Sequence, residues 1–139
     1  MTKSIVIGGV DIATLKAQKV AMQQEANAFV SNAIAEGSAL VEKMLKAESE
    51  EEANRLAEQA LEVFENASLV AGTCGVCFIL PYYEEYGQYE SEEVMSNQIE
   101  DSENEHVQKV WDTSNTLSRL SNVLYSMESD ARGWHSSTC

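Results

Sequence analysis

Residues 12–47 dominate the architecture that this sequence predicts, and they read IATLKAQKVAMQQEANAFVSNAIAEGSALVEKMLKA. Apolar side chains recur in this stretch at intervals of three, four or seven, which places them on one face of an α-helix. Asp11 stands just before the stretch and can cap the helix by accepting a backbone hydrogen bond. We expect one long helix over roughly 12–47, with Gly37-Ser38 as a kink or tight break. The apolar stripe comprises Leu15, Met22, Ala26, Phe29, Ala33, Leu40 and Met44, widened by Val30, Ile34, Val41 and Leu45.

Two capping signals predict further helices. Ser49-Glu50-Glu51-Glu52 is a capping box, in which serine and glutamate satisfy free N–H groups at the start of a helix that runs to Ala67. A second box, Ser102 with Glu105, opens the last helix, for which Gly133 is the predicted left-handed stop. The apolar face of that helix consists of Val107, Val110, Trp111, Leu117, Leu120, Leu124 and Met127.

Length and composition indicate one globular domain. The 139 residues are 44% hydrophobic and 23% charged, with one proline and seven glycines, which is ordinary globular usage. We therefore predict a single all-α domain over 1–139, a small bundle of about four helices with long first and last helices and a frayed tail at 133–139. A minor short β pair or extended core segment is also expected. The N-terminus is too weakly apolar for a secretory signal, so a cytoplasmic protein is expected.

Residues 67–83, ASLVAGTCGVCFILPYY, carry no charge. One interpretation is a membrane span, since the run is marginally long enough. Neither flank is basic, however, and glycines interrupt it. A buried loop, short strand or helix segment that crosses the core, beside Ile5-Val6-Ile7, is the favoured interpretation.

The net charge of −14 is unevenly placed. Residues 1–46 hold four acids and five bases, and residues 106–139 hold three of each. Residues 47–105 hold sixteen acids and the single base Arg55, a net charge of −15. Such a block repels nucleic acid and anionic membrane, and it attracts basic surfaces.

No motif indicates catalysis, and we expect the chain not to be an enzyme. It contains no GxSxG elbow and no glycine-rich phosphate loop after a strand. Cys74-Gly-Val-Cys77 is a redox-like motif, but a helix precedes it where a thioredoxin-type site needs a strand. Buried, reduced cysteines are therefore favoured over a dithiol enzyme, which remains a third hypothesis.

Metal and cofactor sites are not expected either. A zinc site would have to draw on Cys74, Cys77, His106, His135 and Cys139, of which one pair alone has ligand spacing. The run that starts at Asp101 resembles a calcium loop but has His106 where glycine is needed. We therefore predict no metal site and no cofactor-binding residues.

The acidic block predicts a binding function. Tyrosines recur among its glutamates, and they form either a ring that covers the core edge or a contact surface for an arginine-bearing partner. We expect the two acidic segments, Glu48–Glu65 and Glu84–Glu105, to lie near each other and the second to make the contact. The predicted contact residues are Glu84, Glu85, Tyr86, Tyr89, Glu90, Glu92, Glu93, Glu100, Asp101, Glu103 and Glu105.

Two functional hypotheses follow. In the first, the carboxylates occupy the basic surface of a nucleic-acid-binding protein in place of phosphates. In size and charge alone the chain resembles the small inhibitors of restriction or CRISPR systems that phages and mobile elements carry. In the second, it is an acidic chaperone or adaptor, or a self-assembling protein joined through its last helix, that binds by helix packing. Direct binding to nucleic acid or membrane is expected under neither hypothesis.

Overall fold

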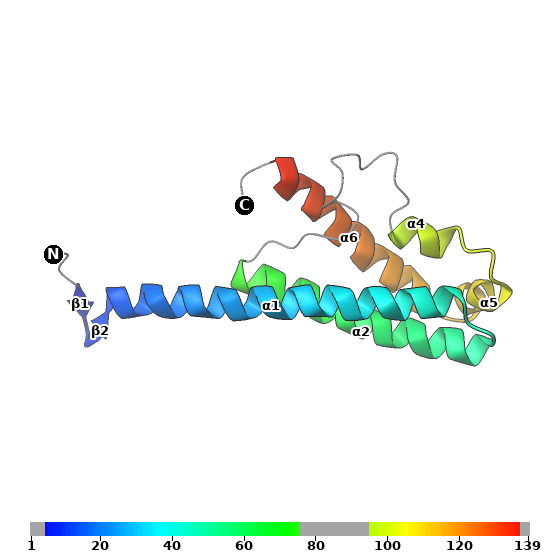
Figure 1. Cartoon of the computed structure of the whole chain (residues 1–139), viewed down its shortest axis with the longest axis horizontal. Coiled ribbons are helices and arrows are strands. Elements are labelled where there is room, and N and C mark those ends of the chain that lie inside the picture. Colours follow the sequence, from blue (N-terminus) through cyan, green and yellow to red (C-terminus); the bar gives the residue numbers. More distant parts are fainter. Residues whose placement is uncertain (1–4, 76–94, 137–139) are drawn as a thin grey trace.

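A computed structural model of the chain describes residues 5–75 and 95–136, with the backbone alone for 130–136. Five helices and one two-stranded hairpin make up these residues, which confirms the prediction of a small all-α bundle (Figure 1). The elements are β1 (Val6–Ile7), β2 (Val10–Asp11), α1 (Ile12–Leu45), α2 (Glu50–Cys74), α4 (Met95–Glu100), α5 (Glu105–Thr113) and α6 (Thr116–Ser136).

Helices α1 and α2 form an antiparallel hairpin of unequal arms (Figure 1). Asp11 caps α1 as predicted, since its Oδ1 accepts from Ala13 N at 3.0 Å. The return helix α2 ends at Cys74, whose carbonyl accepts a hydrogen bond from Gln23 Nε2 at 3.4 Å. The first three turns of α1 therefore extend beyond the end of α2.

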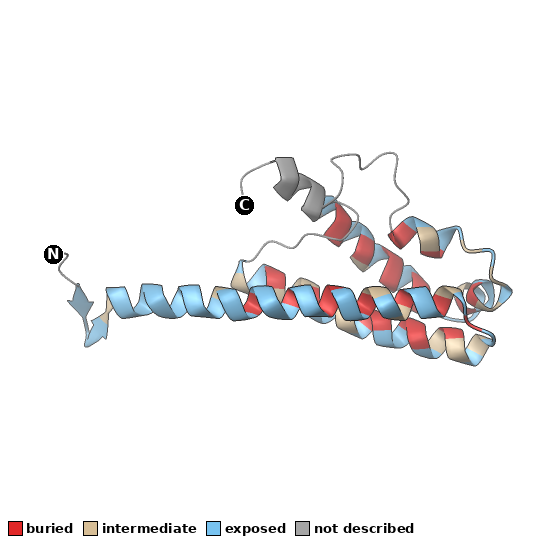
Figure 2. Ribbon diagram, viewed as in Figure 1, coloured by how far each residue is buried: buried red, intermediate tan, exposed pale blue. Residues whose placement is uncertain are grey.

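The core lies where the C-terminal half of α1 meets α2, with α5, α6 and α4 packed over them (Figure 2). Its largest fully buried side chains are Phe64, Met44, Ile99, Leu117, Leu120, Leu124 and Met127. The predicted apolar face of the last helix is confirmed, since it supplies three of these leucines and Met127. Many small residues line α2, including Ala53, Ala57, Ala60, Ala67 and Ala71, and small side chains let neighbouring helices approach closely.

The predicted kink at Gly37-Ser38 is wrong, because α1 continues through both residues. Gly37 is buried, and a Cβ atom there would lie 2.6 Å from Cε2 and Cζ of Phe64. The glycine thus permits close packing of a phenylalanine ring and does not break the helix.

The last helix is two helices, α5 and α6, which corrects the prediction of one. Ser114 separates the two helices, because its backbone is extended. Its Oγ donates to Val110 O at 3.3 Å and accepts from Thr116 N at 3.4 Å. These local bonds compete with the helical ladder. Asn104, not Ser102, caps α5, and α6 runs through Gly133 to Ser136, so the predicted stop at Gly133 is wrong.

The uncharged stretch begins as helix. Helix α2 continues past Ala67 to Cys74 and ends at Gly75, whose φ of 64° is the left-handed conformation that favours glycine. Residues 76–83 lie outside the described residues. Across 5–75 and 95–136, none of the helices combines the length and apolar character that crossing a bilayer requires.

The N-terminal part of the predicted core stripe is not core. Leu15, Met22 and Phe29 are 49%, 47% and 47% exposed, because α2 ends before it could cover the first two. The β1–β2 hairpin, turned by Gly8 and Gly9 at positive φ, is also exposed and lies away from the core (Figure 2).

Candidate functional site

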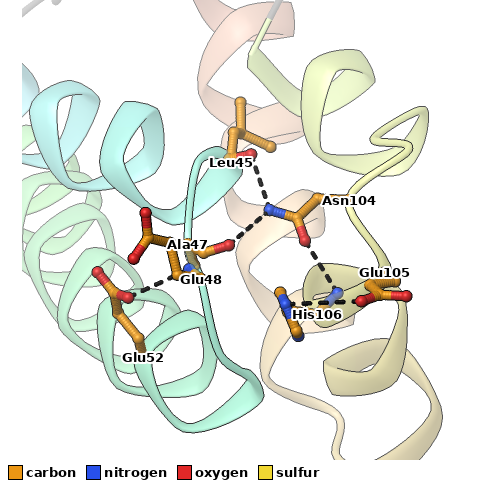
Figure 3. Close-up of polar contacts among 7 residues, drawn as sticks. All are labelled: Leu45, Ala47, Glu48, Glu52, Asn104, Glu105 and His106. Atoms are coloured by element: carbon orange, nitrogen blue, oxygen red, sulfur yellow. Dashed lines mark hydrogen bonds and ion pairs between the residues drawn. The ribbon is translucent and has the colours of Figure 1, made fainter.

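Asn104 fastens together two connections that lie far apart in the sequence (Figure 3). Its Nδ2 donates to Leu45 O at 3.1 Å and to Ala47 O at 3.0 Å, in the α1–α2 connection. Its Oδ1 accepts from His106 N at 2.9 Å and so caps α5. One amide therefore fixes the α4–α5 connection against the α1–α2 connection.

This fastening gathers acidic residues at one end of the molecule, where both connections lie (Figure 1). Positions 46–52 and 101–105 hold seven acids and one base, Lys46. We name the seven acids the acidic end: Glu48, Glu50, Glu51, Glu52, Asp101, Glu103 and Glu105. All are exposed except Glu50 and Glu52, which are half-buried.

Glu50 and Glu52 accept hydrogen bonds that hold the acidic end in place. The capping box is confirmed: Ser49 Oγ accepts from Glu52 N at 3.1 Å. The Glu52 carboxylate reaches back to the N–H of Glu48 at 3.2 Å (Figure 3). Glu50 Oε1 accepts from Thr113 Oγ1 at 3.3 Å, which joins the start of α2 to the end of α5. Glu50 and Glu52 therefore position the backbone of the acidic end.

Four of the predicted contact residues lie at or beside this end. Asp101, Glu103 and Glu105 belong to the acidic end, and Glu100 stands just before it, accepting from Ser121 Oγ at 2.8 Å. The Glu105 carboxylate, 78% exposed, lies 3.7 Å from His106 Nε2. The other predicted contact residues lie outside the described residues: Glu84, Glu85, Tyr86, Tyr89, Glu90, Glu92 and Glu93. The neighbouring tyrosines Tyr82 and Tyr83 also lie outside them.

A second row of carboxylates follows the outer face of α2. Glu58, Glu62 and Glu65 are exposed, and their spacing places them about 6 Å and 4.5 Å apart along the helix axis. Glu65 is paired with Arg119, whose Nη2 lies 3.0 and 3.2 Å from its two oxygens. Glu58 accepts from Asn54 Nδ2 at 3.2 Å. Exposed Arg55 lies between Glu51 and this row in the sequence, so the row is a separate group of carboxylates on α2.

Buried Glu128 holds α4 in place and was missed by sequence reasoning. It is 1% exposed and accepts from Ser96 N at 3.2 Å and Ser96 Oγ at 2.7 Å. The spacing of residues could have predicted its burial. Glu128 follows Leu124 by four positions and so falls on the apolar face of α6. Because this contact anchors α4, it also sets where the α4–α5 connection begins.

The cysteine pair and the histidines gain no site from the described residues. Cys74 is a free, half-buried thiol at the C-terminus of α2, whereas a reactive thiol is favoured at a helix N-terminus. Cys77 and Cys139 lie outside the described residues. Within 5–75 and 95–129, the residues whose side chains are described, no three histidine, cysteine or acidic side chains meet in a group that could hold a metal ion.

The chemistry of the acidic end is that of an acceptor surface. Exposed carboxylates accept hydrogen bonds and attract cations, guanidinium groups above all.

No protein-family model, curated protein or solved structure matches this chain.

Proposed function

We propose that the chain is a non-enzymatic acidic binding protein whose acidic end occupies a basic surface of a partner protein. The carrying observation is the Asn104 clamp, in which one side chain bonds Leu45 O and Ala47 O and so fixes two acidic connections side by side. Positional fixing lowers the entropic cost of binding, because the carboxylates are arranged before the partner arrives.

Helix stabilisation alone does not account for these acids. Glu50, Glu51 and Glu52 sit in the first turn of α2, where the helix dipole favours negative charge. Glu48 and Glu103 lie outside the helices. Asp101 directly follows the C-terminus of α4, where the dipole disfavours an acid. These last three acids therefore suggest a role beyond capping.

A nucleic-acid-binding protein is the proposed class of partner. Such proteins gain much of their affinity from lysine and arginine side chains that face closely spaced negative charge. The acidic end offers a comparable group of seven carboxylates. Occupying that surface would exclude nucleic acid, so the proposed effect is inhibition by competition, as in the anti-restriction and anti-CRISPR inhibitors of phages.

A pair of triple variants with equal net charge tests the proposal. Glu48→Lys, Asp101→Lys and Glu103→Lys together reverse acids outside the helices, and the matched control reverses Glu36, Glu58 and Glu62, exposed acids remote from the Asn104 clamp. Each set changes three charges by two units, from −14 to −8. Far-UV circular dichroism verifies that both variants remain helical.

The readout is capture of partner proteins from the native cell on the immobilised chain. We expect capture at about 50 mM salt, steep loss by about 500 mM, and release by added double-stranded DNA. The variant at the acidic end should lose capture, and the control should keep most of it. Equal capture by the two variants, or capture that DNA does not displace, would refute the proposal.

Binding by helix packing is the second candidate, as a chaperone or adaptor. It is supported by the half-exposed apolar side chains of α1, such as Leu15 and Met22. Apolar burial does not depend on screening by salt, so this candidate predicts capture that is unchanged at high salt.

A further inference from the structure

The N-terminal arm, Ile5–Phe29, carries an exposed apolar row. Leu15, Met22 and Phe29 are 49%, 47% and 47% exposed. They are seven positions apart, so they share one face of α1 through four turns. At the tip of the arm, Ile5, Val6, Ile7 and Val10 are between 45% and 70% exposed. This is more apolar surface than scattered single residues would give.

The row continues a face that is buried elsewhere. Ala26, Val30 and Ala33 lie on the same side of α1 and are at most 7% exposed, because α2 covers them. Helix α2 ends at Cys74, beside Gln23, while the apolar spacing of α1 continues to Ile12. The sequence thus maintains a packing face for about three turns beyond its covering helix.

The arm is also where charge permits two copies to meet. Ile5–Phe29 contain two bases, Lys16 and Lys19, and two acids, Asp11 and Glu25, and are neutral overall. Residues 30–139 hold twenty-one acids and six bases, a net charge of −15. Contact between residues 30–139 of one copy, the acidic body, and the acidic body of a second copy is repulsive. Contact between two arms is not.

We propose that two copies of the chain pair antiparallel through their arms, about a two-fold axis at Met22. In this register Met22 faces its equivalent, and Leu15 of each copy lies level with Phe29 of the second copy. Lys19 of each copy then lies level with Glu25 of the second copy, which gives two equivalent ion pairs. The single helix face is therefore self-complementary in both shape and charge, as a two-fold interface requires.

This pairing keeps the acidic bodies apart and the acidic ends free. Ile12 lies level with Asn32 of the second copy, so the helices overlap for about 30 Å. Each hairpin tip then reaches the second copy's α1 beyond Phe29, where its apolar side chains gain contacts. Leu45, at the acidic end, lies about 35 Å from the axis, which is several screening lengths at physiological salt.

Sedimentation equilibrium of the full chain over a range of concentrations tests the pairing. We expect a species of twice the chain mass of 15.3 kDa. Met22→Glu should give the single-chain mass at every concentration, because it places two carboxylates at the axis. Tyr125→Glu is the matched control, since Tyr125 is 70% exposed on α6, and it should leave the dimer intact.

A charge exchange tests the register. Lys19→Glu or Glu25→Lys alone should raise the dissociation constant by about tenfold, because two like-charged pairs replace two ion pairs. The double variant should restore the wild-type constant. Circular dichroism verifies that each variant is helical, and Leu15→Glu serves as the second disrupting variant.

Four outcomes would overturn the proposal. A wild-type chain that is a monomer at all concentrations would show that something other than a second copy covers the arm. A dimer that Tyr125→Glu disrupts would place the contact on α6. A dimer that Met22→Glu and Leu15→Glu leave intact would exclude the apolar row. A double variant as weak as the single variants would refute the antiparallel register.

Discussion

Replacing Gly37 by alanine sets helix propensity against packing at one position. The new Cβ would lie 2.6 Å from two ring carbons of Phe64 and 3.1 Å from a third. Carbon atoms in favourable contact are about 3.5–4.0 Å apart, so two contacts are short by about 1 Å. Phe64 is completely buried, so its ring has to shift within a close-packed core to admit the new atom. We therefore expect Gly37→Ala to destabilise the fold.

The expected magnitude is a difference of two terms. Alanine is favoured over glycine in a helix by about 1 kcal/mol. Overpacking in a core costs about 1–3 kcal/mol, and two contacts this short place Gly37 at the upper end of that range. The net loss should be about 1–2 kcal/mol in the free energy of unfolding, which lowers the melting temperature by about 3–7 °C for a chain of this size.

Urea unfolding followed by far-UV circular dichroism measures these terms, with all variants at one protein concentration. Gly72 provides the matched control: it is an exposed glycine in α2, and none of the described residues has an atom within 4 Å of its Cβ position. Gly72→Ala should therefore stabilise the fold by about 0.5–1 kcal/mol. Phe64→Leu should cost at least about 1 kcal/mol less in the Gly37→Ala background than in the wild type, because the smaller side chain relieves the clash. If Gly37→Ala stabilised the chain as Gly72→Ala does, the packing argument would be refuted.

Two further expectations concern polar contacts. Asn104→Ala should lower the free energy of unfolding by about 2 kcal/mol, because the cap is lost and the carbonyls of Leu45 and Ala47 are left unsatisfied. Asn104→Ser keeps a capping oxygen and should lose about half as much. Equal losses in urea unfolding would show that the amide does not hold the two connections together. Arg119→Ala should change stability by less than about 0.5 kcal/mol, because its ion pair with Glu65 is about half exposed, and a loss above about 1 kcal/mol would contradict that estimate.

Local signals in the sequence predicted most of the helices correctly. Asp11 and Ser49 cap α1 and α2 as expected, because a capping bond involves residues within three positions of each other. Errors arose where a tertiary contact or a second local bond competes with the pattern. Ser114 divides the last helix through its own hydrogen bonds, and Gly37 faces Phe64, which no local rule could identify.

The candidate site was predictable in composition but not in arrangement. Counting charges located the acidic segments, since net charge is a property of sequence alone. That Glu48 and Glu103 lie at one end depends on Asn104, whose bonds to Leu45 and Ala47 join residues 57 or more positions apart. Glu128 is similar, because its partner Ser96 lies 32 positions away.

The sequence by itself determined that this chain is helical, which faces of its helices are apolar, and that its acids are concentrated in the middle, because periodicity, capping and charge are local quantities. It could not determine which part of the long apolar stripe of α1 is buried. Burial depends on the length of the covering helix, and α2 ends at Cys74, opposite Gln23. The tertiary structure therefore decided that Leu15 and Met22 lie on the surface, although they belong to the same apolar stripe as core residues. That distinction turns the beginning of α1 from core into an exposed arm.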